Sequence, residues 1–211
     1  MARRPKPSGR KRLPDRGRRL QRRAVDTRPT RPRFLIVCEG TQTEPNYFRQ
    51  FRVSAEVVDL EVVGLGDNTL SLVEWTCDRV RQEDFTQVWC VFDRDSFPPQ
   101  RFNAALALAR SRGIQVAYSN EAFEIWYLLH FDYHQAALPR QRYAEMLTER
   151  LEVPYRKNDW ELYDRLESRQ PTAIQNAQRL LDSYAPDHNP EGDNPCTTVH
   201  LLVQTLNEFA H

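Results

Sequence analysis

Acidic residues follow two hydrophobic stretches that are typical of buried strands. Glu39 comes directly after residues 34–38 (FLIVC), and Asp93 and Asp95 come after residues 87–92 (QVWCVF). Uninterrupted apolar runs of this length indicate parallel strands that are buried on both faces, and functional groups in parallel sheets gather at the carboxyl ends of the strands. Because side chains alternate along an extended chain and neighbouring strands are about 4.8 Å apart, we expect these three carboxylates to converge.

Three carboxylates in one partly dry pocket repel each other unless they share protons or bind a cation. Their hard oxygen atoms suit Mg²⁺, with Mn²⁺ as an alternative. A divalent ion in such a site polarises a phosphodiester and lowers the pKa of a bound water. We therefore expect a metal site and a phosphodiester substrate. The competing interpretation is that these acids are solvated loop residues or helix caps, which is common for so short a motif.

The hydrophobic pattern around these acids predicts a mixed α/β fold. Strand patterns cover residues 34–38, 57–65, 87–92 and 114–118, and helical patterns between them cover residues 44–51, 70–80 and 102–109. This alternation is typical of βαβ units with right-handed crossovers, and it predicts a parallel sheet of about four strands flanked by helices.

No strand pattern is expected after Ser119, where the chain changes to helical periodicity. The predicted helices there cover residues 123–131, 141–151, 172–184 and 198–209. We therefore divide the chain into a basic tail at residues 1–32, an α/β core at residues 33–120 and a helical extension packed on that core at residues 121–211.

The tail differs sharply in charge from the rest of the chain. Residues 1–33 hold 14 Lys and Arg against two acidic residues, which leaves 16 basic and 27 acidic residues in residues 34–211. The tail has almost no large apolar residues, so we expect it to be disordered alone and to bind nucleic-acid phosphates. The arginines predicted to do so are Arg18, Arg19, Arg22, Arg23, Arg28 and Arg31. The alternatives are a solvated leader or a contact with an acidic partner surface.

The remaining composition argues against several classes of protein. The four cysteines include no CxxC pair, so neither a disulfide framework nor a zinc site is expected. No apolar stretch is long enough to cross a bilayer, and no apolar segment of a signal peptide follows the basic N-terminus. We therefore expect a cytoplasmic protein that does not associate with a membrane.

The order of the acidic motifs resembles the signature of the Toprim domain of topoisomerases, primases and nucleases. That signature places an acid and a glycine after the first strand and a DxD motif after the third. Four longer segments resemble the RloB family: FLIVCEGTQTEPNYF (34–48), VFDRDSF (91–97), SNEAFEIWYLLHF (119–131) and NPCTTVHLLV (194–203). The resemblance implies a Toprim-like core, a nuclease linked to restriction and phage-defence loci, and an ATPase of the AAA or ABC type as partner.

The same resemblance implies roles for individual residues. Glu39 would be the general acid/base or a metal ligand, Asp93 and Asp95 would hold the metal, and Glu124 would be a further ligand. Glu121 and Ala122 stand where the family usually has a Pro-Cys pair.

Glu44, Thr198 and His200 are secondary candidates for the site. Glu44 and Glu124 both begin predicted helices, where the macrodipole also favours an acid. Thr198 is also suited to cap the last helix. The place of Thr198 and His200 near the site is implied by the family alone.

Histidine and tryptophan residues are expected to have structural roles. His130 and His134 have helical i, i+4 spacing, but the sequence HFDYH lacks the Glu of a zinc-protease helix. The tryptophans fall in apolar patterns, so we expect core packing rather than base stacking. They are Trp75, Trp89, Trp126 and Trp160.

Two other functions compete with a nuclease. A haloacid-dehalogenase-like phosphatase also uses a DxD motif, but on its first strand, whereas here the motif follows the third predicted strand. The other alternative is a non-catalytic subunit that binds nucleic acid or a nucleotide in a defence ATPase complex, because a metal-bound sensor needs the same ligands as an enzyme.

Overall fold

The structure is a computed structural model that describes residues 31–94 and 98–210. From Arg31 on, the described chain forms one compact unit. Asp95 and the tail arginines Arg18, Arg19, Arg22, Arg23 and Arg28 lie outside the described residues, as does the predicted disorder of residues 1–30.

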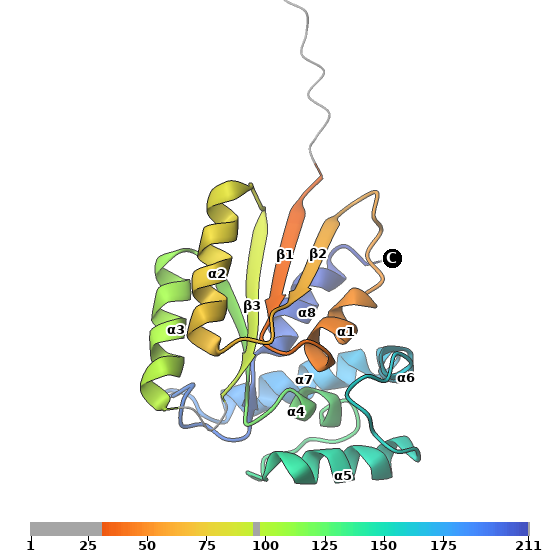
Figure 1. The fold of residues 1–211 in the computed structure, drawn as a ribbon. Helices are drawn as coiled ribbons and strands as arrows, with labels where there is room; N and C mark the ends of the chain where they lie inside the picture. The colour runs from red at the N-terminus through yellow and green to blue at the C-terminus, as the bar shows by residue number, and fades with distance from the viewer. Residues whose placement is uncertain (1–30, 95–97, 211) are drawn as a thin grey trace, which may run out of the picture. The chain divides into compact units, whose positions relative to one another are not determined.

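A five-stranded sheet organises the described residues (Figure 1). Its strands are β1 (Arg33–Cys38), β2 (Asp59–Gly64), β3 (Gln87–Asp93), β4 (Gln115–Asn120) and β5 (Cys196–Thr197), in the spatial order β2-β1-β3-β4-β5. The first four strands are parallel, and β5 is antiparallel to β4. The predicted mixed α/β fold is confirmed.

The expectation that strands end after Ser119 was wrong. Ser119 pairs with Thr197 and Asn120 pairs with Cys196, which adds β5 to the edge of the sheet. The hydroxyl groups of Ser119 and Thr197 are also hydrogen-bonded, at 3.0 Å. A strand of two residues has no hydrophobic period, so the sequence pattern could not reveal it.

Helices cover both faces of the sheet. They are α1 (Thr43–Arg49), α2 (Thr69–Gln82), α3 (Pro99–Ser111), α4 (Glu124–Leu128), α5 (Arg140–Leu151), α6 (Leu162–Glu167), α7 (Gln170–Asp182) and α8 (Val199–Asn207). The short helix α6 was not predicted, because six residues are too few for a helical period to be recognised.

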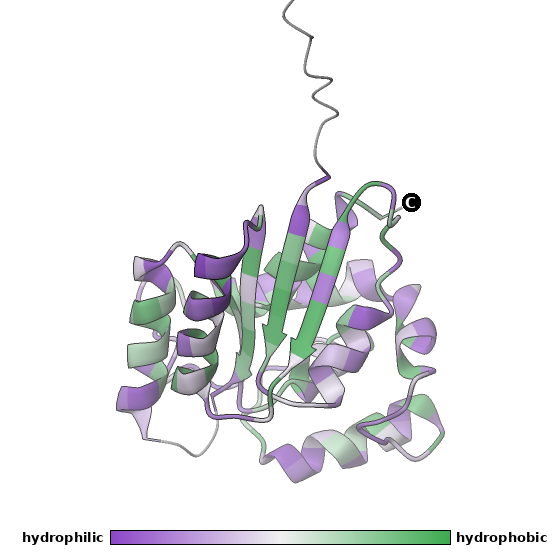
Figure 2. Ribbon diagram, turned by 45° about the horizontal axis from the view of Figure 1, so that its top comes forward, coloured by the Kyte–Doolittle hydropathy of each residue, from purple (hydrophilic) through white to green (hydrophobic). Residues whose placement is uncertain are grey.

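Alternate side chains of β1 belong to two hydrophobic cores. Leu35 and Val37 pack in one core with apolar residues of α2 and α3. Phe34, Ile36 and Cys38 pack in the other with residues of α1, α4 and α8. The strands are mostly hydrophobic but include hydrophilic residues, such as Asp59 and Glu61 in β2, and the helices carry both kinds (Figure 2). A sheet buried on both faces leaves the strand ends as the place for polar chemistry.

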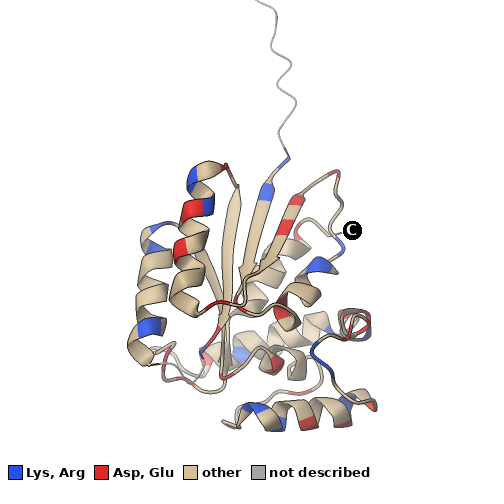
Figure 3. Cartoon of the chain, viewed as in Figure 1, with Lys and Arg blue, Asp and Glu red and all other residues tan. Residues whose placement is uncertain are grey.

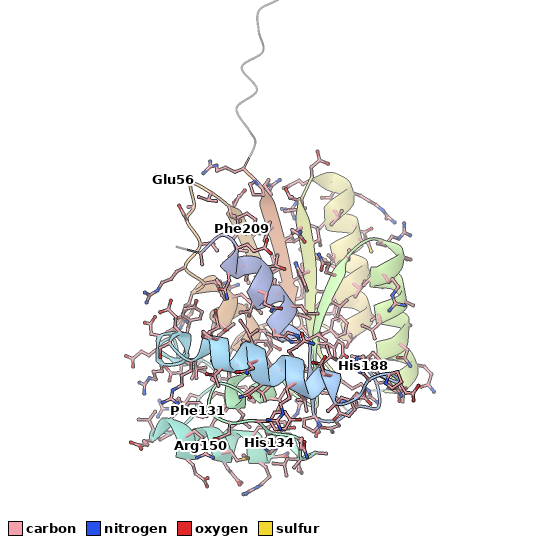
Figure 4. The ribbon with its side chains drawn as sticks, turned by 180° about the vertical axis from the view of Figure 1, so that it is seen from behind. Glu56, Phe131, His134, Arg150, His188 and Phe209 are labelled. Carbon is pink, nitrogen blue, oxygen red and sulfur yellow. The ribbon has the colours of Figure 1, made fainter. Side chains whose placement is uncertain are left out.

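The helices after β4 pack on the face of the sheet that carries α1. Viewed from behind, α7 and α8 cover this face, and α5 lies beyond α7 (Figure 4). Tyr143 and Leu147 of α5 belong to the same core as Phe123 and Trp126. This packing places the connection between α5 and α6 near the carboxyl ends of the strands, where it can contribute side chains to a site.

Candidate active site

A pocket of about 420 Å³ lies at the carboxyl ends of β1 and β3. Its acidic lining residues are Glu39, Glu44, Asp67, Asp93 and Glu124, and its basic lining residues are Arg140 and Lys157. Acidic residues accordingly lie in the loops at this edge of the sheet (Figure 3). The prediction that Glu39 and Asp93 converge is confirmed, because both line this one pocket.

Glu39 is held by hydrogen bonds from two other elements. Its backbone N–H donates to the Val91 carbonyl at 2.8 Å, which continues the pairing of β1 with β3 beyond Cys38. Its Oε2 atom accepts from the Asp93 backbone N–H at 3.1 Å, and its Oε1 atom accepts from the Thr69 hydroxyl at 2.9 Å. These bonds fix the carboxylate at the junction of the two strands and the start of α2.

Asp93, the last residue of β3, has a side chain that is 16% exposed. Its Oδ1 atom is buried and has no hydrogen-bond partner, and its Oδ2 atom lies 3.9 Å from Arg140. Burial raises the pKa of this carboxyl well above its usual range, and the nearby charges of Glu44 and Glu124 raise it further. A buried acceptor oxygen without a hydrogen-bond partner, in a polar pocket, fits a protonated carboxyl group or a bound cation.

Glu44 lies in the first turn of α1 and is only 6% exposed. Burial raises the pKa of Glu44 to about 7, and the charges of Glu124 and Glu39 act in the same direction. Its position depends on a glycine, because a Cβ atom at Gly40 would lie 2.3 Å from the Glu44 Oε2 atom. The Glu-Gly sequence after β1 therefore leaves room for a second acid beside the first.

Glu124 joins the pocket from the first turn of α4 and is 4% exposed. Its Oε1 atom accepts a hydrogen bond from the Tyr155 hydroxyl at 3.1 Å and lies 3.5 Å from the Lys157 ammonium. The predicted placement of Glu124 near Glu39 and Asp93 is therefore confirmed in position, although its role as a ligand stays a prediction.

Sequence reasoning missed Arg140, Tyr155 and Lys157, all of which come from the helical extension. Arg140 begins α5 and also donates to the Glu121 carbonyl at 3.3 Å. Tyr155 and Lys157 lie in the connection between α5 and α6. No motif distinguishes them from other basic and aromatic residues, because tertiary packing places Arg140 and Lys157 in the pocket and Tyr155 against Glu124.

The donor chemistry of the pocket fits a hard divalent cation. Several carboxylates line it, and a buried carboxylate oxygen of Asp93 has no hydrogen-bond partner. However, within residues 31–94 and 98–210 no three His, Cys, Asp or Glu side chains are gathered closely enough to hold one ion. In this arrangement, Arg140 lies 3.9 Å from Asp93 and Lys157 lies 3.5 Å from Glu124, so both bring positive charge to the acids.

Comparison with known proteins identifies the family of the chain. A family model described as RloB-like protein matches residues 34–206. The chain belongs to the RloB-like family. No curated protein and no solved structure matches it. No helix in the described part of this RloB-like protein is both long and apolar enough to span a membrane.

Thr198 and His200 of this RloB-like protein do not line the pocket. Thr198 precedes α8 but makes no side-chain cap; instead its hydroxyl accepts from the Tyr118 backbone N–H at 2.9 Å. The His200 ring is buried, and its Nε2 atom lies 3.3 Å from the Gln178 side-chain oxygen. Burial lowers the pKa of His200 to about 4. Both residues therefore hold α8 in place rather than reach the acids.

Two of the four tryptophan predictions were wrong. Trp89 and Trp126 are buried as expected, but Trp75 is 38% exposed and Trp160 is 57% exposed. The short apolar patterns around these two residues do not show which side of the helix or loop faces solvent.

The other predictions on individual residues concern histidine, cysteine and Arg31. His130 is buried, and its Nδ1 atom lies 2.9 Å from the Trp126 carbonyl, as expected for a structural histidine. The four cysteines are free and buried. Arg31 donates a hydrogen bond to the Ala55 carbonyl, which lies between α1 and β2. Its contact with nucleic acid stays a prediction.

Proposed function

We propose that this RloB-like protein is a magnesium-dependent nuclease of the Toprim type that hydrolyses phosphodiester bonds in DNA or RNA. The observation that carries the proposal is the 3.1 Å hydrogen bond from the Asp93 backbone N–H to the Glu39 carboxylate. It joins the acid after β1 to the acid that ends β3, as the order of motifs predicted. The buried carboxylates of Glu44 and Glu124 in the same pocket add further support.

Mg²⁺, or Mn²⁺ in its place, would be held by Asp93 and Asp95 together with Glu39 and Glu124. When bound, such an ion polarises a phosphodiester and lowers the pKa of a water molecule. Glu39 is suited to accept or return a proton, because its hydrogen bonds with Thr69 and Asp93 fix the direction of its carboxylate.

Arg140 and Lys157 supply positive charge for a phosphate group. Both line the acid pocket, and Lys157 is 58% exposed while it contacts Glu124. A substrate phosphate in the pocket would meet these cations beside the carboxylates, so they would partly neutralise its charge. This arrangement favours a phosphodiester over an uncharged substrate.

The role in phage defence and the ATPase partner rest on the family resemblance and not on a site in the structure. The phosphatase alternative is poor, because Asp93 ends β3 rather than the first strand. The non-catalytic alternative, a subunit that binds nucleic acid or nucleotide in a defence ATPase complex, uses the same acids and is separated from the proposal by a cleavage assay.

The test is cleavage of single-stranded and duplex DNA, RNA and tRNA with Mg²⁺, with Mn²⁺ and with a chelator. We expect metal-dependent cleavage that falls about 100-fold or more in Glu39→Gln and in Asp93→Asn. Glu56→Gln is the matched control, because Glu56 is exposed and lies at the opposite end of the sheet (Figure 4). Full activity in either site variant, or phosphate release from small monoesters alone, would contradict the proposal.

A further inference from the structure

Within the connection between α5 and α6, residues 155–158 direct alternate side chains toward Glu124 and toward a second hollow. Tyr155 and Lys157 both contact Glu124, and Lys157 also lines the acid pocket. Arg156 and Asn158 line a second hollow of about 480 Å³, together with the exposed ring of Trp160. Since consecutive Cα atoms are about 3.8 Å apart, this one segment forms the wall between the two hollows.

Hydrogen bonds hold the segment that forms this wall in a defined position. The Tyr155 backbone N–H donates to the Thr148 hydroxyl of α5 at 3.1 Å, and the Tyr155 hydroxyl donates to Glu124. The Asp159 backbone N–H donates to the Arg156 carbonyl at 3.1 Å, which closes a turn before Trp160. The position of the second hollow relative to the acid pocket is therefore fixed by hydrogen bonds on both sides of Lys157.

The chemistry of the second hollow suits a nucleobase better than a phosphate. The Trp160 ring offers an exposed aromatic surface, and Asn158 offers both a donor and an acceptor. Asp159 and Glu161 line the same hollow, and their carboxylates can accept hydrogen bonds from amino groups of a base. Arg156 and Arg165 also line it, so its two acidic and two basic side chains leave no net positive charge that would select a phosphate.

We propose that this second hollow, the Trp160 subsite, binds an unpaired base of the nucleic acid whose phosphate lies in the acid pocket. Aromatic side chains bind single strands by stacking on base faces, which are hidden inside a duplex. The substrate class is therefore a single strand or a locally unpaired segment. This inference rests on the proposed nuclease function for the identity of the ligand, but it concerns binding and not cleavage.

A binding assay in chelator separates this subsite from catalysis. The full-length protein is titrated into a fluorescent single-stranded oligonucleotide, into an abasic strand of equal length and into a duplex. Salt is kept high, so that phosphate contacts contribute least. We expect Trp160→Ala to weaken binding of the base-bearing strand about 5- to 100-fold, and Trp160→Phe to retain most of the affinity.

The chain offers a matched control in its other exposed tryptophan. Trp75→Ala, on α2, should leave the affinity unchanged, and binding of the abasic strand should be the same in wild type and in Trp160→Ala. Unchanged affinity in Trp160→Ala, an equal loss on the abasic strand, or no binding of a single strand by the wild type would each overturn the subsite. Binding that depends on Trp160, with no cleavage of any substrate, would overturn the nuclease proposal and keep the subsite. Cleavage with binding that does not depend on Trp160 would keep the nuclease proposal and overturn the subsite.

Discussion

Hydrogen bonds from the main chain of β3 and from a side chain of α2 help to position the Glu39 carboxylate. The Asp93 N–H is a backbone group, so a substitution such as Asp93→Asn leaves it in place. The Thr69 hydroxyl is a side-chain partner that mutation can remove, and Thr69 is 5% exposed. Thr69 is therefore a positioning residue, since it touches the acid and does not itself line the pocket.

Thr69→Val should weaken cleavage without abolishing it. The substitution keeps the branched shape but removes the donor to Glu39, so we expect the free energy of unfolding to fall by about 1 kcal/mol. The rate of cleavage should fall with little change in KM, because the lost hydrogen bond fixes the direction of the Glu39 carboxylate and does not contact the substrate. Thr69→Ser restores the hydroxyl and should restore the rate. If both variants were equally slow, the role assigned to the hydrogen bond would be wrong.

At the scale of elements, the pocket depends on the close approach of the turn after β1 to the end of β2. A Cβ atom at Gly64 would lie 2.7 Å from the Gly40 carbonyl oxygen and 3.0 Å from the Pro45 ring. Neither atom can move aside easily, since one is a backbone oxygen and the other belongs to the proline ring at the start of α1. The glycine at the end of β2 therefore lets the turn that carries Glu39 and Glu44 lie against the sheet.

Gly64→Ala should displace this turn. We expect it to lower the free energy of unfolding by about 1–3 kcal/mol and to reduce cleavage, because the added methyl group forces a shift of the backbone beside Glu39. Gly192→Ala is the control, since the three atoms nearest to its Cβ would all belong to the Asn189 side chain, the closest being the amide nitrogen at 2.8 Å. Chemical denaturation of both variants measures the difference, and equal stability of the two would contradict this account.

The four parallel strands and the meeting of Glu39 with Asp93 could be predicted from the sequence. Buried parallel strands produce long apolar runs, and their carboxyl ends must lie at one edge of the sheet. The strand β5 and the helix α6 could not be found, because they are shorter than the periods on which such predictions rest.

The basic half of the site could not be predicted for a different reason. Arg140 and Lys157 follow β4 by 20 and 37 residues, and they reach Asp93 and Glu124 only because α4 and α5 pack together. Trp160 was assigned to the core on its apolar character, although the connection that carries it faces solvent. Packing between helices, rather than local pattern, decides these positions.

At the scale of the whole molecule, buried titratable groups make stability depend on pH in opposite directions. The pKa of Glu44 is raised from 4.5 to about 7, so the folded state binds more protons than the unfolded state between these values. Its contribution to stability is therefore present below pH 4.5 and is lost as the pH rises to about 7. Burial lowers the pKa values of His130 and His200 from 6.5 to about 4, so their contributions are lost as the pH falls through this range.

The difference in free energy of unfolding between Glu44→Gln and wild type separates the effect of Glu44 from that of the histidines. In chelator, Glu44→Gln should gain stability relative to wild type by about 3 kcal/mol between pH 4.5 and pH 7.5, because the variant has no carboxyl to ionise in the buried site. The histidines titrate equally in both proteins, so their effect cancels. Glu56→Gln should show a flat difference over the same range. Denaturant unfolding at each pH measures these values, and a flat difference for Glu44→Gln would show that the acid is not buried as described.

The basic tail precedes a body, residues 34–211, with 16 basic and 27 acidic residues. Such a body repels a polyanion outside its site, so the tail should supply attraction by releasing counterions from phosphates. If about half of the 12 basic residues in residues 1–30 contact a duplex, the tail should contribute on the order of −5 to the slope of log affinity against log salt.

A chain that begins at Arg31 should lose this contribution while it keeps the hydrogen bonds of Arg31 to Ala55 and of Asp59 to the Pro32 carbonyl. Replacing Arg18, Arg19, Arg22, Arg23 and Arg28 with Gln keeps the length of the tail and should flatten the slope by the share of these five charges. Equal slopes and affinities in all three proteins would leave the tail without a role in binding nucleic acid.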